Sequence, residues 1–208
     1  MSLLYKPDWE EAKQRYLAWW AGEAIGRCGL AVTAPKDGAP DEPPPSLPTE
    51  VAARWTDLDY ICLRNHYEHS HTFYGGEAFP IWSGGYPGHT CLPVFMGCPV
   101  ELGPDTGWVE PIWTEPEPPD PEAQNIDKGG RWWRFAIELL RTAAGESAGK
   151  SIPSTGAFGG SGDTLSWLRG NMRLLYDLCD RPDWVCRADI YLMELWCEVY
   201  DTFHGIVR

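Results

Sequence analysis

The sequence predicts an α/β fold in which short strands alternate with helices. Three features carry this prediction: an apolar run at 28–35, a helical pattern over 131–144 that leads into a second strand-like run at 150–158, and a glycine-rich turn before further helices. Alternating strands and helices form βα units whose strands pair in parallel. We therefore expect a mostly parallel sheet with its ligands at the carboxyl ends of the strands.

The N-terminal part contains an expected helix and an expected strand. Asp8 and Glu11 resemble a capping box, and apolar residues then recur at helical spacing from Trp9 to Trp20. The run at 28–35 ends at a proline, and its continuous apolar character predicts a buried strand.

A proline-rich stretch separates this strand from the next helix. Residues 36–48 are too rich in proline to form regular structure, and this composition predicts a surface loop. Thr56 and Asp59 mark the start of a helix that runs to about His71.

The middle of the chain is irregular. Residues 75–130 hold many of the prolines and glycines, and the short pieces AFPIW and LPVFM are candidate strands. A connection of this length is unusual without a function, so part of it is expected to be a functional loop.

Helices dominate the C-terminal part. After the helix over 131–144 and the strand over 150–158, we expect a short helix from about Asp163 and another at 171–178. A long helix follows from Pro182, with Asp180 as its cap.

Length, net charge and hydropathy argue against several classes of protein. The chain has 208 residues, which suits one domain or one domain with an appendage. Its formal net charge of −13 argues against binding to nucleic acid or to anionic membranes, although solubility alone also explains it. No stretch approaches the roughly 18 apolar residues of a membrane span, and the N-terminus turns acidic too early for a signal peptide.

The seven cysteines form no C-x-x-C pair, which indicates reduced thiols in a cytoplasmic protein. Cys91 and Cys98 are expected to be buried thiols. Cys179, Cys186 and Cys197 lie in helical apolar patterns and are expected in the core.

The stretch TGAFGGSGDTLSWLRG, followed by LLYDLCDRPDWV, resembles the uroporphyrinogen decarboxylase superfamily. The segments DWEEAKQRYLAWWAGEAIGR and YGGEAFPIW…FMGCPVELGPDTGWVEPI are similar to a bacterial branch of that superfamily, described as decarboxylase-like or methyltransferase-like. The resemblance runs over most of the chain. It implies that residues 1–208 form a single domain, the N-terminal part of a TIM-type (β/α)₈ barrel, of which 36–48 is a loop.

A complete barrel takes roughly 250 residues or more. We therefore expect this chain to be a natural half barrel, a fragment or part of an assembly, and to form a homo-oligomer or to bind a partner chain that completes the barrel. An exposed sheet edge and exposed apolar faces would drive such association.

The resemblance implies one of two chemistries. The decarboxylases need no cofactor and use an aspartate in the first third of the chain, whereas the methyltransferases hold zinc in their C-terminal half and exchange methyl groups with corrinoid proteins. This sequence has GGEAFPIWSGG, without an aspartate, where the decarboxylases carry theirs, and Ser166 or Trp167 where a tyrosine is usual. We expect no cofactor in this chain, because zinc or a corrinoid partner would need a C-terminal half.

Three residues are candidates for catalysis. Asp163 follows the glycine-rich strand end and can accept a proton, bind a cation or hold a substrate hydroxyl, but it can equally cap a helix. Glu77 has glycine neighbours that suit a strand entrance, with an exposed loop acid as the alternative. His89, in a glycine-rich loop with aromatic residues, can act as an acid, a base or a ligand, or be a solvated loop histidine.

Other residues are candidates for substrate binding. Arg27 and Arg169 can hold carboxylates bidentately, although Arg169 beside Gly170 is equally a helix-end cation. Aromatic and glycine residues of the loops complete the set: Trp82, Tyr86, Phe158, Gly159 and Gly160.

A metal site is not expected. His66 and His69 share a helical face with i, i+3 spacing, whereas zinc favours an i, i+4 pair or a distant third ligand. Two function classes therefore remain open: an enzyme of the decarboxylase or methyltransferase type that binds a small metabolite, and a non-catalytic ligand-binding or assembly module.

Overall fold

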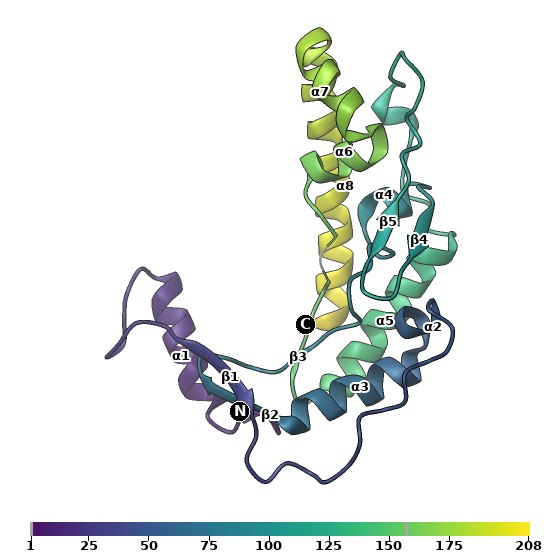
Figure 1. Cartoon of the computed structure of the whole chain (residues 1–208). Coiled ribbons are helices and arrows are strands. Elements are labelled where there is room, and N and C mark those ends of the chain that lie inside the picture. Colours follow the sequence, from purple (N-terminus) through teal and green to yellow (C-terminus); the bar gives the residue numbers. More distant parts are fainter. Residues whose placement is uncertain (1, 157) are drawn as a thin grey trace.

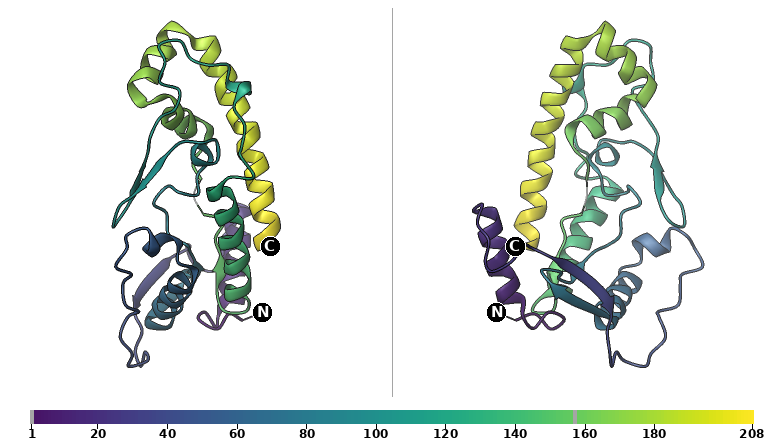
Figure 2. Two further views of the ribbon diagram at one scale, coloured as in Figure 1. Left: turned by 90° about the vertical axis from the view of Figure 1, so that its right-hand side faces the viewer. Right: turned by 60° about the vertical axis from the view of Figure 1, so that its left-hand side comes forward.

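The computed structural model describes residues 2–156 and 158–208, and it is a mixed structure of helices and short strands. Helices α6 (Ser161–Arg169), α7 (Asn171–Asp180) and α8 (Pro182–Val207) lie together in an elongated part of the molecule, here called the column (Figure 1). Helix α1 (Trp9–Trp20) lies at the opposite side, near β1 and β2, and these three elements are here called the arm. Two further views show the same elongated column (Figure 2).

The strands within the described residues form three two-stranded sheets and no closed barrel. β1 (Ala31–Pro35) pairs antiparallel with β2 (Thr72–Gly76), and β4 (Val100–Leu102) pairs antiparallel with β5 (Gly107–Val109). β3 (Ile81–Trp82) pairs in parallel with β6 (Ile152–Pro153). An α/β composition is therefore correct at the coarse level, but the expected mostly parallel sheet is reduced to this one pair.

Helix α5 (Arg131–Ser147) confirms the helix predicted over 131–144, and it is the last element of the long connection from β3 to β6, which also contains β4 and β5. It packs against α8 and against β6, so that β3, α5 and β6 form one βα unit. Of the expected strand over 150–158, residues 152–153 are paired, and Ala157 lies outside the described residues.

Two other expected strands differ from prediction. The run at 28–35 contains β1, but every residue of β1 is exposed because no second layer covers this two-stranded sheet. The piece LPVFM forms α4 (Leu92–Phe95), a short helix whose four residues are all buried. Pro93 in its first turn favours the helix over a strand, because proline fixes φ and needs no hydrogen-bond partner there.

The helix starts were predicted to within a few residues, but not their caps. Asp57 caps α3 (Leu58–His71) by accepting a hydrogen bond from Tyr60 N at 3.1 Å, and the short α2 (Ala53–Thr56) precedes it. Asp8 makes no cap bond to α1, because its carboxylate pairs with Lys6 instead. Arg181, not Asp180, precedes α8, whose first helical residue is Pro182 as predicted.

The main core lies between α4, α5, α6 and α8. One stripe of α8 is buried in it, at Val185, Ala188, Leu192, Leu195, Val199 and Phe203. Cys91 and Cys98 are buried, as expected. The expectation that Cys179, Cys186 and Cys197 lie in the core is wrong, because they lie on the outer faces of α7 and α8, away from this stripe.

A buried ion pair ties the column to the long loop before α5. The Nε atom of Arg169 donates to Asp177 Oδ2 at 2.6 Å, and both side chains are at most 2% exposed. The guanidinium also donates to the carbonyl oxygens of Trp113, at 2.7 Å, and Pro116, at 3.0 Å. Arg169 therefore joins α6, α7 and residues 113–116, a loop that also includes the 3₁₀ turn η1 (Pro121–Ala123) further along.

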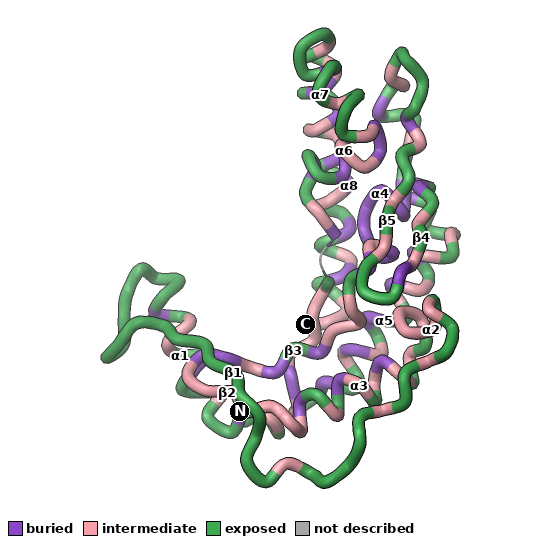
Figure 3. Tube along the Cα trace, in the orientation of Figure 1, coloured by how far each residue is buried: buried purple, intermediate pink, exposed green. Residues whose placement is uncertain are grey.

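Large apolar side chains remain exposed on the outside of the column and on the arm. Figure 3 shows most of α7 as exposed. The exposed apolar side chains of these helices are Leu17, Trp19 and Trp20 on α1, Met172, Leu175, Tyr176 and Leu178 on α7, and Ile190, Met193 and Tyr200 on α8.

We expect Asp177→Asn to lower the free energy of unfolding by about 3–5 kcal/mol, because it leaves the buried Arg169 guanidinium without its counter-charge. Asp120→Asn is the matched control, since it removes the carboxylate of the exposed pair with Arg187 and should cost less than about 1 kcal/mol. Urea unfolding followed by tryptophan fluorescence measures both. Equal costs for the two variants would contradict a structural role of the buried pair.

Candidate functional site

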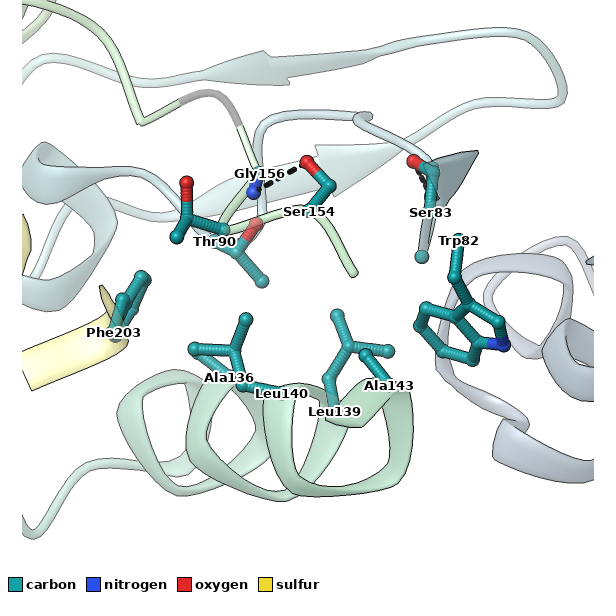
Figure 4. A pocket seen from close by; sticks show the side chains of 13 residues that line it. Trp82, Ser83, Thr90, Ala136, Leu139, Leu140, Ala143, Ser154, Gly156 and Phe203 are labelled. Atoms are coloured by element: carbon teal, nitrogen blue, oxygen red, sulfur yellow. Dashed lines mark hydrogen bonds between the residues drawn. The ribbon is translucent and has the colours of Figure 1, made fainter. Parts of the chain in front are cut away.

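A small cavity lies at the carboxyl ends of both parallel strands. Its lining comes from the loop after β3, the loop after β6, the buried face of α5 and Phe203 of α8 (Figure 4). The carboxyl edge of a parallel strand pair is where α/β folds place their ligands. This cavity is therefore the candidate site.

Two serines hold equivalent positions at this edge. Trp82 pairs with Pro153, so Ser83 and Ser154 are the next residues of the two strands. Gly85 N donates to Ser83 Oγ at 3.2 Å, and Gly156 N donates to Ser154 Oγ at 3.0 Å. Each hydroxyl oxygen accepts one bond from the chain, so each hydroxyl proton is available to a ligand.

The backbone around these serines is fixed. Asn65, a buried residue of α3, donates through Nδ2 to Ser83 O at 2.8 Å and accepts from Ser83 N at 2.9 Å. Ser154 N donates to Trp82 O at 3.0 Å, which ties the second serine to the first strand. The two serines are thus held by hydrogen bonds to rigid elements before any ligand arrives.

Glycines next to Ser83 allow close packing around the cavity. A Cβ atom on Gly84 would lie 2.6 Å from Leu139 Cδ2, and one on Gly85 would lie 2.7 Å from the Trp55 ring. Gly85 also has a φ of +82°, a conformation that favours glycine. The loop therefore approaches α2 and α5 more closely than any larger residue permits.

The cavity is small and uncharged. Its volume of about 20 Å³ holds roughly one water molecule. Trp82 and Leu139 supply apolar walls, whereas Thr90 and Thr155 join the two serines in supplying hydroxyl groups. The arrangement can donate hydrogen bonds to one oxygen-sized group, and none of the described residues that line it is charged.

His89 lies beside this site but is fully buried, unlike a solvated loop histidine. Its ring packs against Trp132 and Phe135, at centroid distances of 5.4 and 5.3 Å. Nε2 lies 3.1 Å from the carbonyl oxygen of Trp55, so Nε2 carries the proton and Nδ1 is an acceptor. Nδ1 has no partner among the described residues, and burial lowers the pKa of His89 to about 4.

Asp163 is exposed in the first turn of α6 and does not cap that helix, which starts earlier, after Gly160. It lies near Tyr86, whose pKa is raised by burial, with smaller contributions from Cys91 and the negative charge of Asp163. An exposed carboxylate there is free to meet a ligand, and the cavity itself does not include it.

Glu77, the other acidic candidate, has a structural role. Glu77 is buried, not an exposed loop acid, and its carboxylate accepts hydrogen bonds from Arg15, from both terminal nitrogens of Arg27 and from Leu30 N. These bonds hold α1 and the start of β1 against the end of β2. Glu77 and Arg27 thus lie in the arm, apart from the cavity between β3 and β6.

The remaining candidates divide into wall residues and structural residues. Trp82 is buried at the cavity wall, and Phe158 is buried against Trp196 and Phe203. Gly159 has a φ of +72° and packs against the Trp167 ring, while Gly160 precedes α6. The donors of Arg169 are already bonded to Asp177 and to backbone carbonyls, which leaves it no role in holding a carboxylate.

The histidines of α3 have separate partners. His66 bonds Tyr5, the Nε2 atom of His69 bonds the carbonyl oxygen of Ile81 at 3.1 Å, and His71 bonds Pro40. Within residues 2–156 and 158–208, no three His, Cys, Asp or Glu side chains gather as a metal site would need. No helix in this part of the chain is long and apolar enough to cross a membrane.

Acidification should destabilise the protein through His89. An unfolded histidine titrates near 6.5, whereas His89 in the fold titrates at about 4, so the unfolded state binds more protons between these values. The contribution of the neutral His89 to the free energy of unfolding is fully present above pH 6.5. It is lost as the pH falls from 6.5 to 4, and the total loss is about 3 kcal/mol. His89→Gln keeps a nitrogen donor for Trp55 and cannot be protonated.

The free energy of unfolding, measured in urea from pH 7 to pH 4, should therefore fall more steeply for the natural chain than for His89→Gln. The carboxylates contribute equally to both proteins, so the difference isolates His89. Parallel curves would contradict its burial as a neutral ring.

Comparison of the chain with protein-family models, with curated proteins and with solved structures gave no match in any of the three.

Proposed function

We propose that this chain is the N-terminal part of a uroporphyrinogen-decarboxylase-like barrel and binds a small carboxylated or methylated metabolite. The observation that supports this best is the cavity at the carboxyl ends of β3 and β6, with α5 as the last element of the connection between the two strands. Methyl transfer or decarboxylation would be the chemistry of the complete barrel.

In this proposal the residues of the site divide their roles. Ser83 and Ser154 donate hydrogen bonds to a ligand oxygen, and Trp82 supplies an apolar wall. Asp163 acts as the proton acceptor or holds a substrate hydroxyl, because it is ionisable and exposed near the loop after β3. His89 stays neutral and ties the loop after β3 to Trp55 of α2.

We propose that this chain by itself holds no cofactor, because the resemblance assigns zinc to the C-terminal half of the methyltransferases. A zinc ion or a corrinoid partner would belong to a C-terminal half. All seven cysteines are free, which is usual in a reducing compartment, and we propose a cytoplasmic location on that ground.

A second candidate function is a non-catalytic ligand-binding or assembly module. Two observations favour it: the cavity holds about one water molecule, and no charged group lines it. Exposed apolar side chains on α7 and α8 suit an interface, with a second copy or with a chain that completes the barrel.

Turnover separates the two functions. The chain is incubated with small di- and tricarboxylates, or with methylated thiols together with a reduced corrinoid as the methyl acceptor, and release of carbon dioxide or of the free thiol is followed. We expect Asp163→Ala to abolish turnover with little loss of stability, and Ser83→Ala with Ser154→Ala to weaken ligand binding at least tenfold. Ser70→Ala, which removes a hydroxyl on α3 outside the cavity, is the control.

A fully active Asp163→Ala variant would remove that residue from the mechanism. Binding without turnover in any of these proteins would favour the non-catalytic module.

Self-association is expected through the exposed face of α7. Light scattering over a concentration series should show a dimer or a larger species, and Leu175→Glu should raise its dissociation constant at least tenfold, because it places a charge on an apolar interface. Asn171→Glu adds the same charge at a polar position of α7 and should change little. A chain that stays monomeric at high concentration contradicts the homo-oligomer and favours a different partner chain.

A further inference from the structure

A second, larger cavity lies on the arm. It has a volume of about 240 Å³ and is bounded by α1, by the residues before β1 and by Glu77. Trp19, Leu30 and Ala31 give it apolar walls, and Arg15 and Tyr16 give it polar ones. Small-molecule pockets start at roughly 300 Å³, so this volume suits a ligand about the size of one ring.

Two arginines bind Glu77, and of these Arg15 lines the cavity whereas Arg27 does not. They also differ in the hydrogen-bond donors that remain free. Arg27 donates to Glu77 through both terminal nitrogens, at 2.7 and 2.8 Å, and also to its neighbour's carbonyl oxygen. Arg15 donates to Glu77 through Nε. Among the described residues, nothing accepts a hydrogen bond from its two terminal nitrogens, so Arg15 keeps free donors at the cavity.

The cluster carries one positive charge in excess. Hydrogen bonds from Arg27, supported by those from Leu30 N and Arg15, outweigh burial and lower the pKa of Glu77 to about 2. Glu77 is therefore ionised at neutral pH and cancels one of the two guanidinium charges. Among the described residues, the charged ones that line the cavity are Arg15 and Glu77, in a chain whose net charge is −13.

We propose that this cavity binds a small carboxylate with an apolar or aromatic body. The carboxylate would accept hydrogen bonds from the terminal nitrogens of Arg15, which match its two oxygens. The body would lie against the Trp19 indole and Leu30. This site is separate from the cavity between β3 and β6 and does not depend on the function proposed for that cavity.

Calorimetric titration of the full chain with three probes tests the proposal. Benzoate should bind, whereas benzamide, which has the same shape without the charge, and inorganic phosphate, which has charge without the apolar body, should bind at least tenfold more weakly. Benzoate affinity should also fall as sodium chloride is raised, because Arg15 is partly exposed.

Two variants locate the site, with one control. Arg15→Gln should weaken benzoate binding by roughly 10- to 100-fold, the usual effect of losing hydrogen bonds from a charged donor. Arg187→Gln removes the same charge from an exposed pair on α8 and should leave the affinity unchanged. Trp19→Ala, at a side chain that is 62% exposed, should weaken binding roughly threefold to tenfold without affecting folding.

Unchanged benzoate affinity in Arg15→Gln would overturn the proposal, as would equal binding of benzoate and benzamide. Equal binding of phosphate and benzoate would overturn the apolar part of the site. If Arg15→Gln fails to fold, an unchanged benzoate affinity in Trp19→Ala would overturn the proposal.

Discussion

The parallel pairing of β3 with β6 is the constraint on which the candidate site depends. The ladder contains two residue pairs, yet it sets the register of everything that follows each strand. Because Ser83 and Ser154 come next in that register, their hydroxyl groups line the same cavity. The hydrogen bonds of Asn65 to Ser83, on the side of α3, supply the rigidity that such a short ladder lacks.

Two clusters built on buried charges join segments that the strands do not join. Arg169 and Asp177 connect the column to the loop at 113–116, and Glu77 connects α1 to the ends of β1 and β2. In both clusters a buried charge has an opposite charge within hydrogen-bond distance, as burial requires. Residues that look suited to bind a substrate carboxylate thus serve the fold, which explains why the cavity between β3 and β6 is uncharged.

Sequence patterns predicted the helices well and the strands poorly, for physical reasons. α5 and α8 are long and amphipathic, so periodicity alone identifies them. β1 has apolar residues but no covering layer, and its burial depends on contacts that periodicity does not contain. The sequence predicted Arg169 and Glu77 as site residues. Their structural role could not be seen there, because partners such as Trp113 and Arg15 lie far away in sequence. Ser83 and Ser154 were missed, although the repeated Ser-x-Gly after each strand was a readable signal.

The proposed assembly and the proposed ligand binding would be linked through the parallel strand pair. Within the described residues, β3 and β6 pair with each other and with no further strand, whereas parallel strands normally lie in larger sheets covered on both faces. A strand added beside either one in the same direction would bring its own carboxyl end to the cavity. That neighbour would widen a space that now holds about one water molecule, and it would supply side chains to an uncharged site. The same contact would cover exposed apolar surface, since Ile81 of β3 is itself exposed. Under the proposed assembly, a chain that pairs with β3 or β6 would both cover Ile81 and complete the site.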